Sequence, residues 1–254
     1  MSNSNKVDVA FDKQLLDLGI EHNHTLDSST ETASYGYFGA SGSGKSTGVF
    51  YLLHNVITNI SNSRLWICDG KAYDYQFLEN IEDSRYFPYI GEGDGMPAGM
   101  EQFSQMFTDR LTGKCDSRTY ELIVLEEWSS VISMLNAEKA TAPIARKMMA
   151  QAFAVTSQGR AYNVHALFVL QKPQMDFLSG FRENLTNIIA LGRLSPEVAK
   201  MCGFNEFKHF NNDSSKRGIG WFLDNNKLHQ IKVPHFSPDD FARFRASIIE
   251  GVTR

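Results

Sequence analysis

The clearest chemical signature in this sequence is the segment GASGSGKST, which begins at Gly39 and ends at Thr47. It fits the pattern G-x-x-x-x-G-K-[ST], in which glycines let successive backbone N–H groups face a chain of phosphates. Lys45 is expected to reach the β- and γ-phosphates of ATP, and Ser46 to hold Mg²⁺. The alternative is a flexible loop rich in Gly and Ser. The nucleotide-binding residues that we expect are Gly39, Ala40, Ser41, Gly42, Ser43, Gly44, Lys45, Ser46 and Thr47.

Two adjacent carboxylates, Glu126 and Glu127, follow the apolar run LIVL that begins at Leu122. In a Walker B element the first acid holds the Mg²⁺ shell and the second activates the attacking water. We therefore expect Glu126 to be a metal ligand together with Ser46, and Glu127 to be the general base. Aspartate is usual where Glu126 stands, so the longer side chain is expected to shift the metal geometry. The alternative is a pair of exposed acids at a strand end, and the upstream phosphate loop favours the catalytic interpretation.

A third candidate, Gln171, ends the apolar run HALFVLQ that begins at His165. A polar side chain at that strand end would face the γ-phosphate and could sense hydrolysis. A single Gln after a strand has little meaning by itself, so this assignment depends on the two motifs already described.

These residues require strands that end at one edge of a sheet, and the sequence alternates strand-like and helical segments. Strands separated by helices predict a mostly parallel sheet with helices on both faces, where ligands bind at the carboxyl ends of strands. Strands are expected at 35–38, 64–69, 84–90, 120–128, 165–172 and 187–192, with a hairpin over 220–233. Helices are expected at 45–59, 72–81, 100–111, 129–136, 143–159, 195–203 and 237–251, with a loop over 91–99.

Composition places the chain among ordinary globular proteins. It has 254 residues with a formal net charge of −4, from 25 Lys and Arg against 29 Asp and Glu. This charge excludes a polybasic protein that coats nucleic acid, although it leaves room for a local basic patch. The cysteines Cys68, Cys115 and Cys202 are odd in number and far apart, which argues against a disulfide framework. No signal peptide or membrane-spanning run is evident, so we expect a cytoplasmic protein.

The order of the motifs resembles the FtsK/SpoIIIE branch of the HerA–FtsK ATPases. After the phosphate loop come Asp69-Gly70-Lys71, the LIVLEEW segment and Arg160 to His165, which leads into a strand ending Gln171-Lys172-Pro173. Arg193-Leu194-Ser195 and the glycine turn Gly218-Ile219-Gly220 complete the series. Lys172 and Glu126 depart from the usual Arg and Asp of the family. The likeness covers roughly residues 30–250.

The resemblance implies a RecA-like P-loop NTPase fold with a C-terminal hairpin and helix. We accordingly expect a polar N-terminal segment over residues 1–30, frayed or with one weak strand, and an ATPase domain over residues 31–254. It also implies a homo-oligomeric ring, usually a hexamer, around double-stranded DNA, with ATP between subunits. A neighbouring subunit would then supply an arginine finger. Arg110 and Arg160 are the preferred candidates, and Arg193 is a weaker one.

A ring that threads DNA needs only a few phosphate contacts per subunit, because every subunit repeats them. An ordinary solvated surface charge is the alternative for each residue of this set. The candidate DNA contacts are Lys139, Arg146, Lys147, Lys172, Lys216 and Arg217.

Three functions follow from this interpretation. The preferred one is an ATP-driven DNA-translocating motor of a plasmid, conjugative element or phage. The second is a viral ATPase that packages double-stranded DNA. The third belongs to another class: a nucleotide-binding protein-interaction module like the ATPase domains of type VII secretion. The Glu126 departure and the acidic net charge keep the third hypothesis open.

Overall fold

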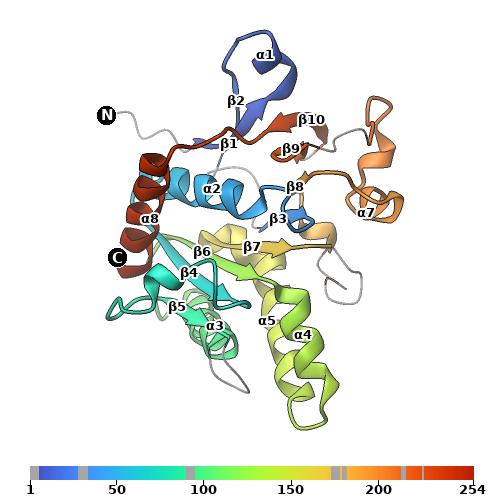
Figure 1. Cartoon of the computed structure of the whole chain (residues 1–254). Helices are drawn as coiled ribbons and strands as arrows, with labels where there is room; N and C mark the ends of the chain where they lie inside the picture. The colour runs from blue at the N-terminus through green and yellow to red at the C-terminus, as the bar shows by residue number, and fades with distance from the viewer. Residues whose placement is uncertain are drawn as a thin grey trace.

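The computed structural model describes residues 6–27, 34–89, 95–172, 178, 182–212, 216–224 and 226–254. In these ranges the strands form one ten-stranded sheet in the order β2-β1-β10-β9-β8-β3-β7-β6-β4-β5 (Figure 1). Their bounds are β1 Lys6–Asp12, β2 Asn23–Asp27, β3 Ser34–Gly39, β4 Ser63–Asp69, β5 Tyr86–Pro88, β6 Tyr120–Glu126, β7 Val164–Leu170, β8 Asn187–Leu191, β9 Ile219–Asp224 and β10 Lys227–Lys232.

The centre of the sheet is parallel, from β8 through β3, β7, β6 and β4 to β5. Strands β3, β6, β7 and β8 are buried along their whole length, as expected for apolar strands covered on both faces. The C-terminal hairpin of β9 and β10 joins β8 in antiparallel pairing. The expected mostly parallel sheet with a C-terminal hairpin and helix is therefore confirmed.

Helices cover both faces of this sheet (Figure 1). Helices α2 and α8 pack together over one face, while α3, α4 and α5 contribute to the apolar core on the other. Helix α8 begins at a capping box in which Ser237 and Asp240 bond each other's backbone N–H groups. The helix bounds are α1 Lys13–Asp17, α2 Lys45–Asn59, α3 Met96–Leu111, α4 Trp128–Ala137, α5 Ala142–Gln158, α7 Pro196–Met201 and α8 Pro238–Thr253.

The N-terminal region differs from its expected form. Strands β1 and β2 form an antiparallel pair, and β1 also pairs with β10, so residues 6–27 extend the edge of the main sheet. The expectation of a frayed terminus with one weak strand is wrong for these residues. Asn55 and Asn59 of α2 hold β1 in place by donating to the backbone oxygens of Asp8 and Lys6.

The helix expected at 72–81 is also wrong, because only a single 3₁₀ turn forms there, at Gln76–Leu78. The buried carboxylate of Asp69 accepts hydrogen bonds from the backbone N–H groups of Lys71 and Tyr73, and Ala72 has a φ of 50°. These bonds close a turn, and the left-handed φ of Ala72 lies outside the helical region, so an α-helix does not begin there. No helix in the described ranges is both long and apolar enough to cross a lipid bilayer.

Candidate nucleotide-binding site

The phosphate loop lies between β3 and α2, as the motif requires. Gly42 and Gly44 have φ values of 78° and 97°, which favour glycine, and Gly44 is the N-cap of α2. A side chain at Gly39 would begin only 2.5 Å from the Oγ of Ser43. The backbone N–H of Gly218, before β9, donates to the carbonyl of Ser43 at 2.8 Å. The loop therefore has the backbone geometry of an anion cradle, with the N-terminus of α2 facing it.

A cavity of about 270 Å³ opens directly over this loop. It collects side chains from the loops that follow β3, β4 and β7, together with Arg217 before β9. Parallel strands place these loops at one edge of the sheet, which is where α/β proteins bind ligands. The lining residues are Ala40, Ser41, Gly42, Gly44, Lys45, Ser46, Thr47, Lys71, Tyr73, Asp74, Gln171 and Arg217.

Two further cavities adjoin the loop. One, of about 370 Å³, shares Gly44, Thr47 and Arg217 and extends to His235 and Phe236 after β10. The other, of about 470 Å³, shares Ser46, Thr47 and Asp74 and is lined by aromatic residues of α2 and α8. The cavity with His235 and Phe236 has the mixed apolar and polar lining that a nucleotide base requires.

Lys45 is 6% exposed and lies between the two Walker B carboxylates. Its Nζ is 3.5 Å from Oε1 of Glu126 and 3.9 Å from Oε1 of Glu127. The P-loop and the Walker B strand are therefore brought together as the sequence predicts.

Glu126 is 1% exposed, and its Oε1 accepts no hydrogen bond from the described residues despite the nearby Lys45 ammonium. Burial raises the pKa of this carboxyl to about 7, against the opposing charge of Lys45. A buried carboxylate oxygen without a hydrogen bond is suited to a bound cation. Among the described residues no cluster of three His, Cys, Asp or Glu side chains forms a complete metal site. This fits Mg²⁺, which is usually held by one or two protein oxygens together with phosphates and water.

Ser46, the other expected metal ligand, donates a hydrogen bond from Oγ to Oδ2 of Asp74 at 3.2 Å. Asp74 lies in the turn after β4 and was not singled out by its sequence pattern. The Ser46 hydroxyl and the Asp74 carboxylate both line the cavity over the phosphate loop, and oxygen atoms of these kinds suit Mg²⁺. The residues present therefore fit the metal.

Glu127 has a φ of 53° and is the N-cap of α4. Its Oε1 forms an ion pair with Nζ of Lys71 at 2.6 Å and accepts a hydrogen bond from Nε2 of Gln171 at 3.3 Å. Burial would raise the pKa of Glu127, but the hydrogen bond and charge of Lys71, with the charge of Lys45, lower it overall. Glu127 is therefore held as a carboxylate, the state that a general base requires, and Gln171 lies beside it.

Lys71 and Arg217 line the cavity over the phosphate loop, but the sequence patterns did not predict them as residues of the nucleotide site. Lys71 belongs to the D-x-K motif, which provided a family resemblance but no function. Arg217 was grouped with the DNA contacts, whereas the structure places it over the phosphate loop, with its Cγ 3.6 Å from the position of a Cβ on Gly44.

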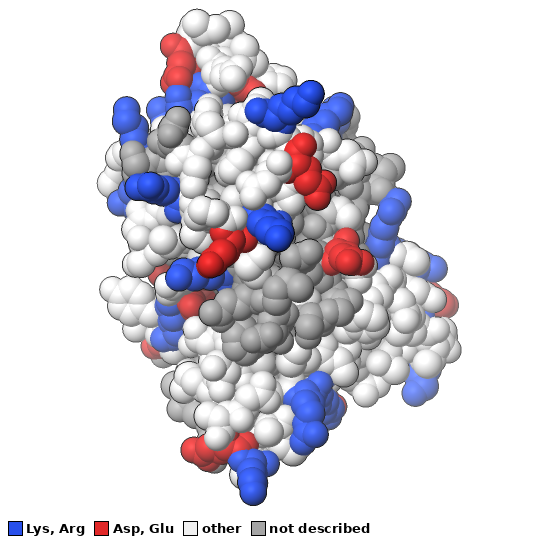
Figure 2. Space-filling view, turned by 90° about the vertical axis from the view of Figure 1, so that its right-hand side faces the viewer, with Lys and Arg blue, Asp and Glu red and all other residues white. Residues whose placement is uncertain are grey.

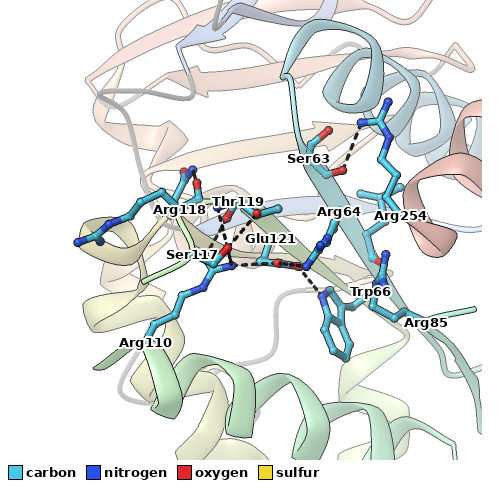
Figure 3. A network of polar contacts seen from close by, with 12 residues as sticks. Ser63, Arg64, Trp66, Arg85, Arg110, Ser117, Arg118, Thr119, Glu121 and Arg254 are labelled. Atoms are coloured by element: carbon cyan, nitrogen blue, oxygen red, sulfur yellow. Dashed lines mark hydrogen bonds and ion pairs between the residues drawn. The ribbon is translucent and has the colours of Figure 1, made fainter. Parts of the chain in front are cut away.

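Arg110 contacts Glu121 near the start of β6, at the opposite end of that strand from Glu126, and Figure 3 shows the contact. It is 5% exposed, forms an ion pair with Glu121 at 2.9 Å, and donates to the backbone oxygens of Thr119 and Tyr162. An arginine finger has to reach into a neighbouring subunit. The interior position of Arg110 is incompatible with this expected role. Arg160 is exposed before β7, and Arg193 is exposed after β8, at the edge that carries the phosphate loop.

The basic residues considered for DNA binding occupy several elements. Lys139 follows α4, Arg146 and Lys147 lie on α5, and Lys147 forms an ion pair with Glu101 at 2.8 Å. Among the described residues, Figure 2 shows basic and acidic side chains interspersed on one face, without a continuous basic patch. Pro173, which ends the Gln171-Lys172-Pro173 motif, lies outside the described residues.

Comparison of the sequence with protein-family models gave no match, and comparison with curated proteins gave none either. Solved structures do match. The pCW3 conjugation coupling protein TcpA, in its monomer form with ATPγS, superimposes with a TM-score of 0.68 at 13% identity, over 96% of this chain and 72% of TcpA. The type VII secretion ATPase EccC of Thermomonospora curvata gives 0.62 at 17% identity, over 97% of this chain and 31% of that cytoplasmic domain.

B204, the DNA-packaging ATPase of Sulfolobus turreted icosahedral virus, gives a TM-score of 0.52 at 13% identity, over 81% of this chain and 99% of B204. The fold that the motif resemblance implied is therefore confirmed. The chain has the RecA-like fold that these ATPases share. It spans less than a third of the EccC domain and most of TcpA and B204.

Proposed function

We propose that this chain is an ATP-hydrolysing motor that translocates double-stranded DNA as a homo-oligomeric ring. One observation carries the ATPase assignment. The phosphate loop, the buried Lys45 and the carboxylates Glu126 and Glu127 converge at one edge of the sheet, and Gln171 contacts the general-base candidate. A binding module without hydrolysis would not need a carboxylate held ionised at this position.

In the proposed reaction, Glu127 accepts a proton from the attacking water while the bond between the γ-phosphorus and the bridging oxygen of ATP breaks, yielding ADP and phosphate. Lys45 and the backbone N–H groups of the loop hold the phosphate charge. Ser46 and Glu126 would hold Mg²⁺, which when bound would neutralise charge on the phosphates. Gln171 orients Glu127 and the water beside it.

The DNA assignment depends on the fold and on exposed basic side chains. TcpA and B204 are named for conjugation coupling and DNA packaging, and both share this fold. Helices α4 and α5 form a hairpin that extends from the sheet, with Lys139 at its turn and Arg146 near the start of α5 (Figure 1). A few such contacts per subunit, repeated around a ring, would grip the phosphate backbone without reading sequence.

Packaging of viral DNA is the second candidate. It is favoured because the superposition covers 99% of B204, so this chain contains a counterpart of almost the whole of that DNA-packaging ATPase. Both candidates share the same ATP chemistry and the same DNA contacts. They differ in whether the DNA enters a capsid or another cell.

The test is Mg²⁺-dependent ATPase activity with and without duplex DNA, measured alongside the mass in solution with ATPγS. We expect DNA to stimulate turnover and nucleotide to promote a ring. Lys45→Ala should abolish nucleotide binding, and Glu127→Gln should bind ATP but lose about 100-fold or more in turnover. Glu138→Gln, at an exposed acid after α4, is the matched control and should be unaffected. If duplex DNA does not raise ATP turnover and no oligomer forms, the DNA-motor proposal is excluded and a protein-interaction module is favoured.

A further inference from the structure

Several hydrogen-bond donors lie close to one carboxylate oxygen of Glu127, the candidate general base. Oε1 of Glu127 pairs with Nζ of Lys71 at 2.6 Å, accepts from Nε2 of Gln171 at 3.3 Å and lies 3.9 Å from Nζ of Lys45. Oε2 accepts only a long hydrogen bond, 3.4 Å, from Oγ of Ser130 among the described contacts. A carboxylate oxygen with this many donors cannot readily accept a proton from water. This arrangement therefore ties Oε1 of Glu127 most tightly to Lys71.

Lys71 is placed for this contact by a rigid turn. The backbone N–H of Lys71 donates to Oδ1 of the buried Asp69 at 3.0 Å, and that of Gly70 donates to the carbonyl of Glu126 at 3.1 Å. A side chain at Gly70 would begin 2.5 Å from the same carbonyl. The turn therefore packs directly against the Walker B strand, and these contacts hold the backbone of Lys71 in place.

The ammonium of Lys71 also faces the phosphate loop. Lys71 lines the cavity of about 270 Å³ over that loop, together with Lys45 and Ser46, and its side chain is 36% exposed. A lysine carries three donors on a flexible stem, so it can exchange one anionic partner for another within its reach. The anion that this cavity would admit is the terminal phosphate of ATP.

We propose that Lys71 is a second phosphate-binding lysine, stored on Glu127 in the nucleotide-free protein and transferred to the γ-phosphate when ATP binds. This inference rests on the proposed ATPase function. The transfer exchanges a carboxylate for a more highly charged phosphate and leaves Oε1 of Glu127 open to the attacking water. ADP carries no γ-phosphate, so it leaves Lys71 on Glu127. Glu127 would then be released from its ion pair with Lys71 only when the bound nucleotide carries a γ-phosphate.

A purely structural ion pair between Lys71 and Glu127 makes a different prediction. In that case the loss of Lys71 would weaken the turn after β4 and would lower the binding affinity for ATP and for ADP by the same factor. Transfer of Lys71 predicts instead that Glu127 competes with the γ-phosphate for the same ammonium. Removal of the Glu127 charge should then strengthen binding of the triphosphate only while Lys71 is present.

The experiment measures equilibrium binding of ATPγS and of ADP, each with Mg²⁺, to the full chain. Four proteins form a cycle: wild type, Lys71→Met, Glu127→Gln and the double variant. Lys71→Arg tests rescue by a retained charge. Lys114→Met is the control, because Lys114 lies before β6 at the other end of the sheet and its side chain is 70% exposed.

We expect Lys71→Met to weaken ATPγS binding about tenfold and ADP binding less than about twofold, with partial rescue by Lys71→Arg. Glu127→Gln should tighten ATPγS binding several-fold, and this gain should disappear in the double variant. Equal losses for ATPγS and ADP in Lys71→Met, or a gain from Glu127→Gln that persists without Lys71, would overturn the inference. If wild type binds neither nucleotide, the proposed function itself fails.

Discussion

The two ends of strand β6 each carry a buried glutamate, and the two have opposite surroundings. Glu121 at the start and Glu126 at the end are both 1% exposed. Each oxygen of Glu121 accepts a hydrogen bond, from Nη2 of Arg110 at 2.9 Å and from Nε1 of Trp66 at 2.8 Å (Figure 3). Oε1 of Glu126 accepts none within the part of the chain that the structure describes, and burial raises the pKa of that carboxyl to about 7.

The difference separates a structural carboxylate from one that awaits a ligand. Burial of a charge is costly unless hydrogen bonds and a counter-charge offset it, and this compensation exists at Glu121. At Glu126 the charges of Lys45, at 3.5 Å, and of Lys71 offset part of the cost. The strained φ of 53° at Glu127 lies at the same end. The carboxyl end of the sheet therefore carries a buried carboxylate oxygen that a bound Mg²⁺ ion beside ATP would satisfy.

The largest effect on stability is expected at the structural end, from Arg110→Met. This substitution keeps the length of the side chain but leaves Glu121 without its buried counter-charge. We expect the free energy of unfolding to fall by about 3–5 kcal/mol, measured by urea denaturation. A loss below about 1 kcal/mol would show that the network of Figure 3 contributes little to folding.

A smaller effect, with a defined pH dependence, is expected from Glu126→Gln without nucleotide. The folded-state pKa of Glu126, about 7, lies above its ordinary value of 4.5, so the carboxyl takes up a proton on folding. Its contribution to stability is therefore present at low pH and lost as pH rises through about 7. Relative to wild type, the Gln variant should gain roughly 2 kcal/mol between about pH 5 and 8. Parallel denaturation curves across this range measure it, and a constant difference contradicts it.

The smallest effect is expected from Arg64→Ala. Arg64 also contacts Glu121, at 3.5 Å, but its side chain is 41% exposed. Solvent screens such a pair, so the loss should stay below about 1 kcal/mol. Thermal unfolding of this variant beside Arg110→Met would show whether Glu121 depends on its buried partner, as we expect, or equally on both arginines.

The central part of the site was predictable from the sequence because its signals are local. The phosphate loop and the paired acids each occupy a short segment with a required residue pattern, between a strand and a helix. Lys71, Asp74 and Arg217 could not be assigned in this way. They lie on separate loops, and only the order of the parallel strands brings them to one cavity.

The errors also have physical causes. Arg110 looks like a surface residue on α3, but Glu121 and two backbone carbonyls from other segments draw it into the interior. Residues 72–81 have helical spacing, but the turn that the Asp69 carboxylate closes gives Ala72 a left-handed φ of 50°, which an α-helix does not adopt. Strand β2 lies at the edge of the sheet and its sequence, NHTLD, is mostly polar, so its pattern resembles a loop.

The central claim is that Glu126, at the carboxyl end of β6, serves ATP hydrolysis, whereas Glu121, near the start of the same strand, stabilises the fold. It is tested most directly by comparing Glu121→Gln with Glu126→Gln, measuring the free energy of unfolding and the Mg²⁺-dependent ATP turnover of each at about pH 8. We expect Glu121→Gln to lose about 3 kcal/mol or more of stability and to keep its turnover per folded molecule. Glu126→Gln should be at least as stable as wild type and lose turnover about 100-fold. Equal behaviour of the two variants, or full turnover in Glu126→Gln, would contradict the account.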